Sequence, residues 1–201
     1  MLHFGSVLKA LLYGFRWRIK NALGLPNKFG PPVLGSGLDH AVERHLRICR
    51  TLLPQLPQDL PADFTAAEIG CGDCLAAADM MLGLGAKHVH LVEFQAFPIT
   101  TLHREALLKT LAPDLPNRAA ILLPDDPPAL NPVFCTFHAG LLEKIELPEP
   151  VDLVFSFDVL EHVEDLSGFF SACHRFLKPG SYSLHKFDLS GHEFFEDPTP
   201  P

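Results

Sequence analysis

The chain has 201 residues, enough for one domain with a substantial core, and 47% hydrophobic and 20% charged residues, as in a globular protein. Its formal net charge is −8, but residues 1–30 contain five basic residues and no acid, so the remainder carries −13. This acidic main body disfavours nonspecific binding to nucleic acid or to acidic membranes. No run approaches the roughly 20 apolar residues of a membrane span.

Apolar residues at three- and four-residue steps over residues 2–23 predict an amphipathic N-terminal helix with basic residues on its other face. This helix either docks on the domain or makes a weak peripheral contact with a membrane surface. A linker rich in proline and glycine follows, and then a second helix over residues 38–53. We therefore expect an N-terminal helical segment and linker over residues 1–60 and the main domain over residues 61–201.

Short apolar segments alternate with helical patterns through the main domain, which predicts an open α/β fold with a parallel sheet and right-handed crossovers. The proline-rich stretch 113–132 is predicted to be a surface loop. Gly180 is predicted to end the last helix as its left-handed cap. The five strand candidates are residues 64–70, 87–93, 133–140, 151–160 and 181–189, and the helices between them reach to about Leu84, span 97–112 and run from Leu166 to Leu177.

Residues 66–80, with the sequence AAEIGCGDCLAAADM, contain two overlapping motifs after a predicted strand. Gly70-x-Gly72 could form a tight turn that lets the backbone approach a nucleotide cofactor, with free N–H groups at the following helix. Cys71-x-x-Cys74 could instead be a redox dithiol at a helix N-terminus. Glu93 favours the glycine interpretation, because it ends the next strand candidate and can accept hydrogen bonds from both hydroxyls of a ribose.

The five cysteines are odd in number and scattered, which predicts reduced thiols and a cytoplasmic location rather than a disulfide framework. A structural zinc site would need a second pair of ligands at compact spacing, and the other cysteines are isolated. Asp158, Glu161 and His162 lie close in sequence, but a hard cation needs more oxygen ligands than they offer. We expect no metal site.

Four segments occur in an order that resembles the class I S-adenosylmethionine-dependent methyltransferases, in the broad group of small-molecule enzymes. They are AAEIGCGDC, HLVE, VDLVFSFDVLEHVED and FLKPGSYSLHKFDL, which together span residues 66–189, about 60% of the chain. Three positions depart from the family pattern. Cys74 replaces a frequent third glycine, Ser181 replaces the second glycine after the proline, and no acid follows the third strand near Gly140.

The resemblance implies a Rossmann-like sheet with N-terminal helices, and S-adenosylmethionine as cofactor. The family sheet has further strands after the fifth, so we expect a truncated chain that lacks the last strands, because a stop there leaves an open sheet edge. The residues expected to bind the cofactor are Glu68, Gly70, Cys71, Gly72, Glu93, Phe94, Gly140 and Phe157.

The implied reaction is methyl transfer to a small-molecule acceptor by in-line displacement, in which positioning supplies much of the acceleration. A hydroxyl acceptor also needs a base, for which the candidates are His162, His185 and Asp188. His162 could equally pack against or cap the helix after the fourth strand. The alternatives left open are a catalytically inactive cofactor-binding protein, an RNA methyltransferase, which the acidic main body disfavours, and a thiol oxidoreductase.

Overall fold

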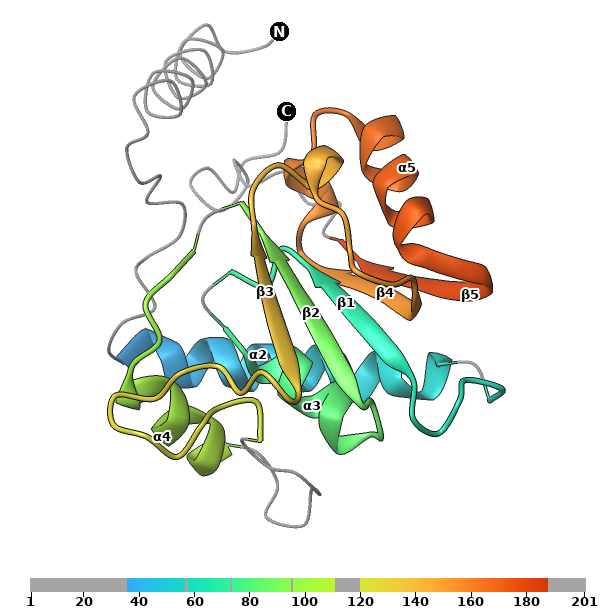
Figure 1. Ribbon diagram of the computed structural model, residues 1–201. Coiled ribbons are helices and arrows are strands. Elements are labelled where there is room, and N and C mark those ends of the chain that lie inside the picture. Colours follow the sequence, from blue (N-terminus) through green and yellow to red (C-terminus); the bar gives the residue numbers. More distant parts are fainter. Residues whose placement is uncertain (1–35, 57, 73, 95, 111–119, 188–201) are drawn as a thin grey trace, which may run out of the picture. The chain divides into compact units, whose positions relative to one another are not determined.

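The computed structural model describes residues 36–187 apart from positions 57, 73, 95 and 111–119. Two predictions therefore lie outside the described residues, the amphipathic helix over 2–23 and the role of Asp188. The described residues form one parallel sheet of five strands in the order β3-β2-β1-β4-β5 (Figure 1). The strands are β1 Thr65–Ile69, β2 His88–Glu93, β3 Cys135–Ala139, β4 Val151–Phe157 and β5 Leu177–Lys186.

The strand order reverses between β1 and β4. From β1 the chain proceeds outward to β2 and β3, then crosses back to β4, which pairs with the other side of β1. All pairs are parallel, so the carboxyl ends of all five strands meet at one edge of the sheet. Ligands of open α/β proteins bind at this edge, beside such a reversal.

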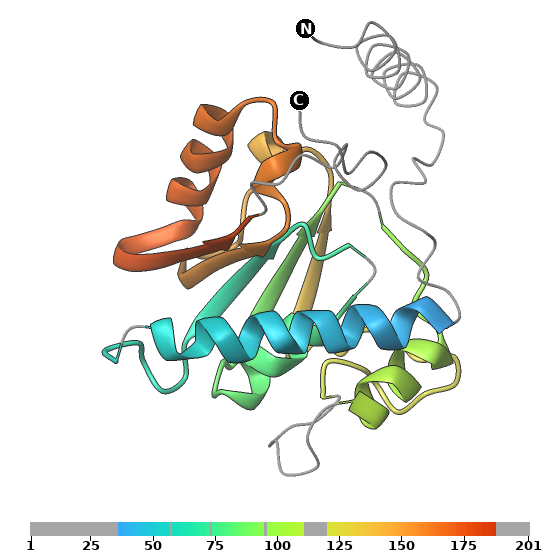
Figure 2. The same ribbon diagram turned by 180° about the vertical axis from the view of Figure 1, so that it is seen from behind.

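Helices cover the two faces of the sheet unequally. Figures 1 and 2 show α2, α3 and α4 on one face, and α5 on the opposite face. The α-helices are α2 Ser36–Leu52, α3 Ala76–Gly83, α4 Thr101–Thr110 and α5 Leu166–Phe176, and the short 3-10 helices are η1 Leu53–Gln55, η2 Leu142–Lys144 and η3 Leu160–His162.

Alternation along the strands divides the core into two parts. Ala66, Leu153 and Phe155 face α2 and α3 in the larger cluster, whereas Ala67 and Val154 face α5 in the smaller one. Every residue of β4 is buried, as expected for a central parallel strand covered on both faces. The predicted Rossmann-like parallel sheet with flanking helices is thus confirmed.

The helix predicted over residues 38–53 is present as α2, and it packs on the sheet domain. Its Val42, Leu46 and Cys49 are buried in the larger core cluster together with residues of α3 and α4. The residues from Ser36 onward therefore share a hydrophobic core with the segment predicted to begin at residue 61. The division at residue 60 stays a prediction.

One local prediction was wrong and another was confirmed only in part. Helix α5 ends at Phe176, and Leu177 is already extended as the first residue of β5, so Gly180 does not cap the helix. Gly180 has a φ of 80° and instead lies within an irregularity of β5, where the pairing with β4 shifts between Val151 and Leu153. In the stretch predicted to be a surface loop, the described residues 120–132 form no helix or strand, but Ile121 is 0% exposed and belongs to the larger core cluster.

Among the described helices, none has both the length and the apolar composition needed to cross a membrane.

Candidate functional site

The carboxyl ends of β1, β2 and β3 are joined to one another by backbone hydrogen bonds. Gly70 N, just after β1, donates to Val92 O at 2.8 Å, and Gly140 N, just after β3, donates to Glu93 O at 2.9 Å. Gly70 and Gly140 have φ values of 71° and 146°. The structure therefore brings together the glycine loop and Glu93, which the glycine interpretation placed in one site, and Gly140, which the family resemblance added to them.

The Glu93 carboxylate reaches across this edge to the β1 loop. Its Oε2 accepts a 2.8 Å hydrogen bond from Gly72 N, and its Oε1 accepts a 2.7 Å hydrogen bond from Phe94 N. Each carboxylate oxygen has a second lone pair, so further hydrogen bonds can be accepted. Phe94 itself is 42% exposed, beside the carboxylate.

The two glycines of the loop have different surroundings. A Cβ atom on Gly70 would lie 2.5 Å from Val159 Cγ2, so the residue after β4 packs directly on this glycine. Gly72 has a φ of 59°, and among the described residues a Cβ atom there would have no neighbouring atom within 4 Å. Gly70 is thus needed for close packing within the protein, whereas the space over Gly72 is open to a ligand.

Glu68 is a buried acid directly beneath the loop. It lies in β1 and is 2% exposed, and its Oε2 makes no hydrogen bond within the described part of the chain. Burial, and then the charge of Glu93, raises the pKa of Glu68 from its ordinary 4.5 to about 8, against the opposing effect of a hydrogen bond from the Ala78 backbone. Glu68 is therefore largely protonated at neutral pH.

The raised pKa predicts a specific dependence of stability on pH. The folded protein binds the Glu68 proton more tightly than the unfolded chain does. The contribution of Glu68 to the free energy of unfolding is therefore fully present below pH 4.5 and is lost as the pH rises to about 8. Between pH 5 and pH 9 the free energy of unfolding should fall more in the wild type than in Glu68→Gln, by an amount on the order of a few kcal/mol. Urea unfolding of both proteins at each pH measures this difference, and identical pH profiles would contradict it.

The Cys-x-x-Cys motif does not have the environment of a redox dithiol. Cys71 and Cys74 are 1% and 3% exposed, and both belong to the larger core cluster. Burial, with a smaller contribution from the charge of Glu68, raises the pKa of Cys71 well above its ordinary value. A reactive thiol needs exposure and a lowered pKa, so the structure disfavours the oxidoreductase interpretation.

Both motif cysteines should consequently be dispensable for binding the cofactor. The Cys71 and Cys74 side chains are buried, and the described contact of the loop with Glu93 is made by the backbone N–H of Gly72. Cys71→Ala and Cys74→Ala should each leave the dissociation constant of S-adenosylhomocysteine within about tenfold, roughly 1.4 kcal/mol. Calorimetry tests this, and the dithiol interpretation would regain support if either variant abolished binding while remaining folded.

The segment after β4 forms the other side of the site. Phe157 is 4% exposed and packs within the core against Phe155, with ring centroids 5.5 Å apart, so only its backbone can face a ligand. Asp158 follows with a φ of 56°. His162, the last residue of η3, is exposed.

His185 lies on the α5 face of the sheet. Its Nδ1 is 2.8 Å from Ser156 Oγ of β4, and its ring packs edge-on against Phe169 and Phe170 of α5. Burial lowers the pKa of this imidazole, and its Nε2 is hydrogen-bonded to Ser183 Oγ. No described contact joins His185 to the glycine loop, and its catalytic role stays a prediction.

The Asp158 carboxylate is held by two cations that the sequence patterns did not connect. It contacts Lys186 Nζ at the end of β5 and Arg44 Nη2 on α2. The sequence motifs place Asp158 and Lys186 at the ends of two different strands, but they do not show that the two side chains meet. Arg44 could not be found in this way, because nothing local in α2 tells where the helix packs on the sheet.

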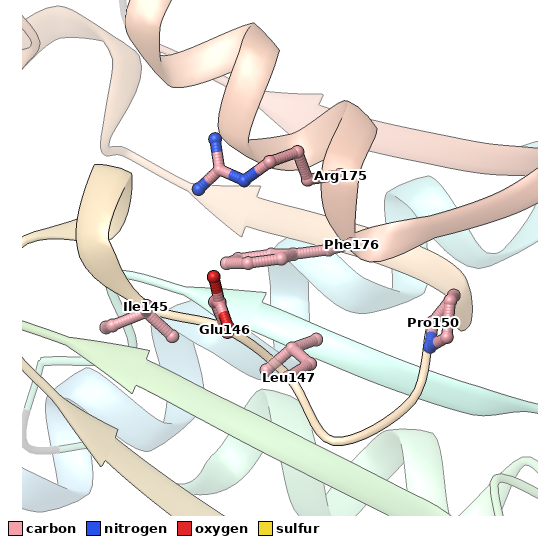
Figure 3. A pocket seen from close by; sticks show the side chains of 6 residues that line it. All are labelled: Ile145, Glu146, Leu147, Pro150, Arg175 and Phe176. Atoms are coloured by element: carbon pink, nitrogen blue, oxygen red, sulfur yellow. The ribbon is translucent and has the colours of Figure 1, made fainter.

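A shallow pocket of about 230 Å³ lies elsewhere, before the amino end of β4 (Figure 3). Arg175 Nη2 donates to Glu143 O at 3.1 Å beside it. The pocket lies at the amino end of β4, away from the glycine loop, and ligands of parallel α/β sheets bind at the carboxyl ends of the strands. It is lined by Ile145, Glu146, Leu147, Pro150, Arg175 and Phe176.

The comparison with protein families decides the identity of this arrangement. A family model described as a methyltransferase domain matches residues 67–184, which is more than half of the chain. The chain belongs to this methyltransferase family. The match covers the glycine loop, Glu93 and the segment after β4, and it confirms the resemblance to class I S-adenosylmethionine-dependent methyltransferases. The cofactor of the methyltransferase is S-adenosylmethionine.

Solved structures resemble the chain at low identity. An S-adenosylmethionine-dependent methyltransferase from Mesorhizobium loti is 24% identical, with 74% of this chain and 55% of that one covered, at a TM-score of 0.45. The glycopeptide N-methyltransferase MtfA is 17% identical, with 71% and 52% covered, at 0.42. A Trypanosoma brucei PRMT1 enzyme–prozyme complex with AdoHcy is 17% identical, with 75% and 41% covered, at 0.47.

The chain spans about half the length of these solved structures. No curated protein matches the chain significantly. The family assignment therefore rests on the domain match.

The residues at the glycine loop fit an S-adenosylmethionine molecule. The space over Gly72 is open, the Glu93 carboxylate can accept further hydrogen bonds, and backbone groups at Gly140 lie at the same edge. Glu68 is buried, and its Oε2 makes no hydrogen bond within the described part of the chain, so its expected contact with the cofactor stays a prediction. Glu93 would hold the ribose, and the loop backbone would pack along the rest of the nucleoside.

Proposed function

We propose that this methyltransferase transfers a methyl group from S-adenosylmethionine to a small-molecule acceptor. The observation that supports this most strongly is the Glu93 carboxylate, which lies 2.8 Å from Gly72 N at the end of β2. There a carboxylate can accept hydrogen bonds from ribose hydroxyls while it remains anchored to the loop. The acidic main body supports a small molecule over RNA as the acceptor.

When bound, S-adenosylmethionine supplies a sulfonium methyl that an acceptor nucleophile displaces in line, so that the carbon–sulfur bond breaks and a neutral thioether leaves. The protein must hold the acceptor on the opposite side of the methyl from sulfur. We place the acceptor on the β4 and β5 side of the edge, because the β1 to β3 side carries the glycine loop and Glu93. Val159, packed on Gly70, separates the two sides.

A hydroxyl acceptor would also have to lose its proton. His162 is the better placed of the two described histidine candidates, since it is exposed on η3 beyond the carboxyl end of β4, whereas His185 packs against α5. We propose His162 as the proton acceptor in that case. Asp188 lies outside the described residues, and its catalytic role remains a prediction.

We further propose a cytoplasmic location, in which the helix predicted over residues 2–23 either docks on the domain or makes a weak peripheral contact with a membrane. The five cysteines are free and buried, as in a protein of a reducing compartment. The basic, amphipathic composition of residues 2–23 supports the membrane contact.

Methyl transfer is tested with S-adenosylmethionine labelled in the methyl group. The chain is incubated with separate pools of hydroxy, amino and thiol compounds and with total RNA, and label in each acceptor fraction is counted. Transfer to a small molecule, lost on heating the protein, is the expected result. Transfer to RNA alone would overturn the choice of acceptor, and cofactor binding without transfer in any pool would favour the inactive cofactor-binding protein.

A further inference from the structure

A charged cluster lies at the β4 and β5 side of the site and is not used by the cofactor loop. It consists of Asp158 after β4, Lys186 at the end of β5 and Arg44 on α2. Arg44 Nη2 lies 2.5 Å from Asp158 Oδ2, and Lys186 Nζ contacts Asp158 Oδ1. Asp158 N also donates to Lys186 O at 2.8 Å, so the backbone and side chains join the same strand ends.

Asp158 has a left-handed backbone conformation, which residues other than glycine, asparagine and aspartate rarely adopt. Its φ is 56°, and it is the one non-glycine residue with a positive φ in the described part of the chain. Strain of this kind is retained mainly where the surrounding structure fixes a functional geometry. The Asp158 side chain is only 11% exposed, so the two cations and the strand ends hold it in place.

Arg44 and Lys186 keep most of their hydrogen-bond donors available. Their side chains are 46% and 32% exposed, and within the described residues each contacts Asp158 alone. A guanidinium has five N–H donors and an ammonium three, so one shared carboxylate leaves most of them directed toward solvent. Two cations anchored on one carboxylate form a fixed group of donors suited to an anion.

The charged cluster is adjacent to the cofactor loop. Phe157 pairs in register with Lys186, so Asp158 lies at the carboxyl edge, and the next residue, Val159, packs on Gly70. The cluster thus lies on the opposite side of the strand-order reversal from Glu93. A group bound here would be close to the bound cofactor without occupying the space over Gly72.

We propose that Arg44 and Lys186 bind an anionic group of the methyl acceptor, a carboxylate or a phosphate, and that Asp158 positions both cations. This inference rests on the proposed function, because it names the chemical class of the acceptor. Binding the acceptor through a charged group remote from the reacting atom fixes its orientation. It also explains why a chain with an acidic main body has two partly exposed cations at this edge.

Inorganic phosphate and sodium acetate are suitable probes of this site. Each is titrated at constant ionic strength, balanced with chloride, into the ¹⁵N-labelled chain with and without saturating S-adenosylhomocysteine. Backbone amide signals of Asp158, Val159 and Lys186 are followed by NMR. At least one anion should give saturable shifts there, and the stronger of the two identifies the acceptor group as phosphate or carboxylate.

Arg44→Gln and Lys186→Gln should each weaken this anion binding about threefold to fivefold. Arg47→Gln, an exposed arginine on the same helix, is the matched control and should leave it unchanged. Melting temperatures of the three variants show whether each is folded. If Arg44→Gln is unfolded, Arg44→Lys replaces it as the test, and this variant should retain most of the affinity because it keeps the charge.

The inference is overturned if neither anion shifts these signals in a folded chain, or if Arg47→Gln has the same effect as Arg44→Gln. The two proposals fail separately. Loss of the anion response with intact binding of S-adenosylhomocysteine rejects the anionic acceptor alone. Failure to bind S-adenosylhomocysteine rejects the proposed function, and the titration without this ligand still decides whether the charged cluster binds anions.

Discussion

Glu93→Ala is expected to raise the dissociation constant of S-adenosylhomocysteine at least about thirtyfold, roughly 2 kcal/mol. Hydrogen bonds to a charged group contribute about 1.5–3 kcal/mol each, and the loss of two is rarely additive. The variant also loses the acceptor for Gly72 N and Phe94 N, which loosens the connection between the β1 loop and β2. Isothermal titration calorimetry measures the change in affinity.

Two control variants separate the role of Glu93 from a general effect of charge. Glu105→Ala removes an exposed acid of α4 and should bind as the wild type does. Glu93→Asp keeps the charge but is one methylene shorter, so it should keep part of the affinity. If Glu93→Ala binds as tightly as the wild type at an unchanged melting temperature, then Glu93 does not hold the ribose.

Gly70→Ala should lower the free energy of unfolding by about 2–5 kcal/mol. Its φ of 71° disfavours an L side chain by about 1–2 kcal/mol, and the added Cβ would lie 2.5 Å from Val159 Cγ2. Relieving a contact of that length in a packed region costs roughly 1–3 kcal/mol more. Chemical unfolding of the wild type and the variant measures the sum.

The two causes can be separated with the neighbouring glycine and with Val159. Gly72→Ala adds a methyl group at a similar φ but with no atom within 4 Å, so its effect on stability should be smaller. Val159→Ala removes the clashing methyl groups, so Gly70→Ala should cost at least about 1 kcal/mol less in that background. Equal costs in both backgrounds would show that Val159 does not pack on Gly70.

The sequence was sufficient to predict those features of the fold and of the site that depend on neighbouring residues in the chain. The strands were found because β4 is buried on both faces and therefore nearly continuously apolar, and the site because glycines and Glu93 directly follow strands. In a parallel sheet such residues meet without further information, since all carboxyl ends lie at one edge. The predicted positions of Gly70, Gly72 and Glu93 at this edge followed from that rule, whereas Gly140 was indicated only by the resemblance to the methyltransferase family.

The predictions that failed, and the contact that was missed, depended on tertiary packing. Gly180 has the left-handed φ expected of a helix cap, but pairing with β4 extends β5 back to Leu177 and places this glycine inside the strand. Ile121 is buried although prolines surround it in sequence. Arg44 joins the charged cluster only because α2 packs on the sheet, which no local pattern in the helix records.

The most direct test of the central claim is calorimetry of the chain with S-adenosylmethionine and with S-adenosylhomocysteine. The glycine loop and the Glu93 carboxylate form one site, so each ligand should bind with a stoichiometry near one, and each should prevent the other from binding. A folded sample that gives no heat with either ligand at high micromolar concentration, at two temperatures, would contradict the assignment of this edge as the cofactor site.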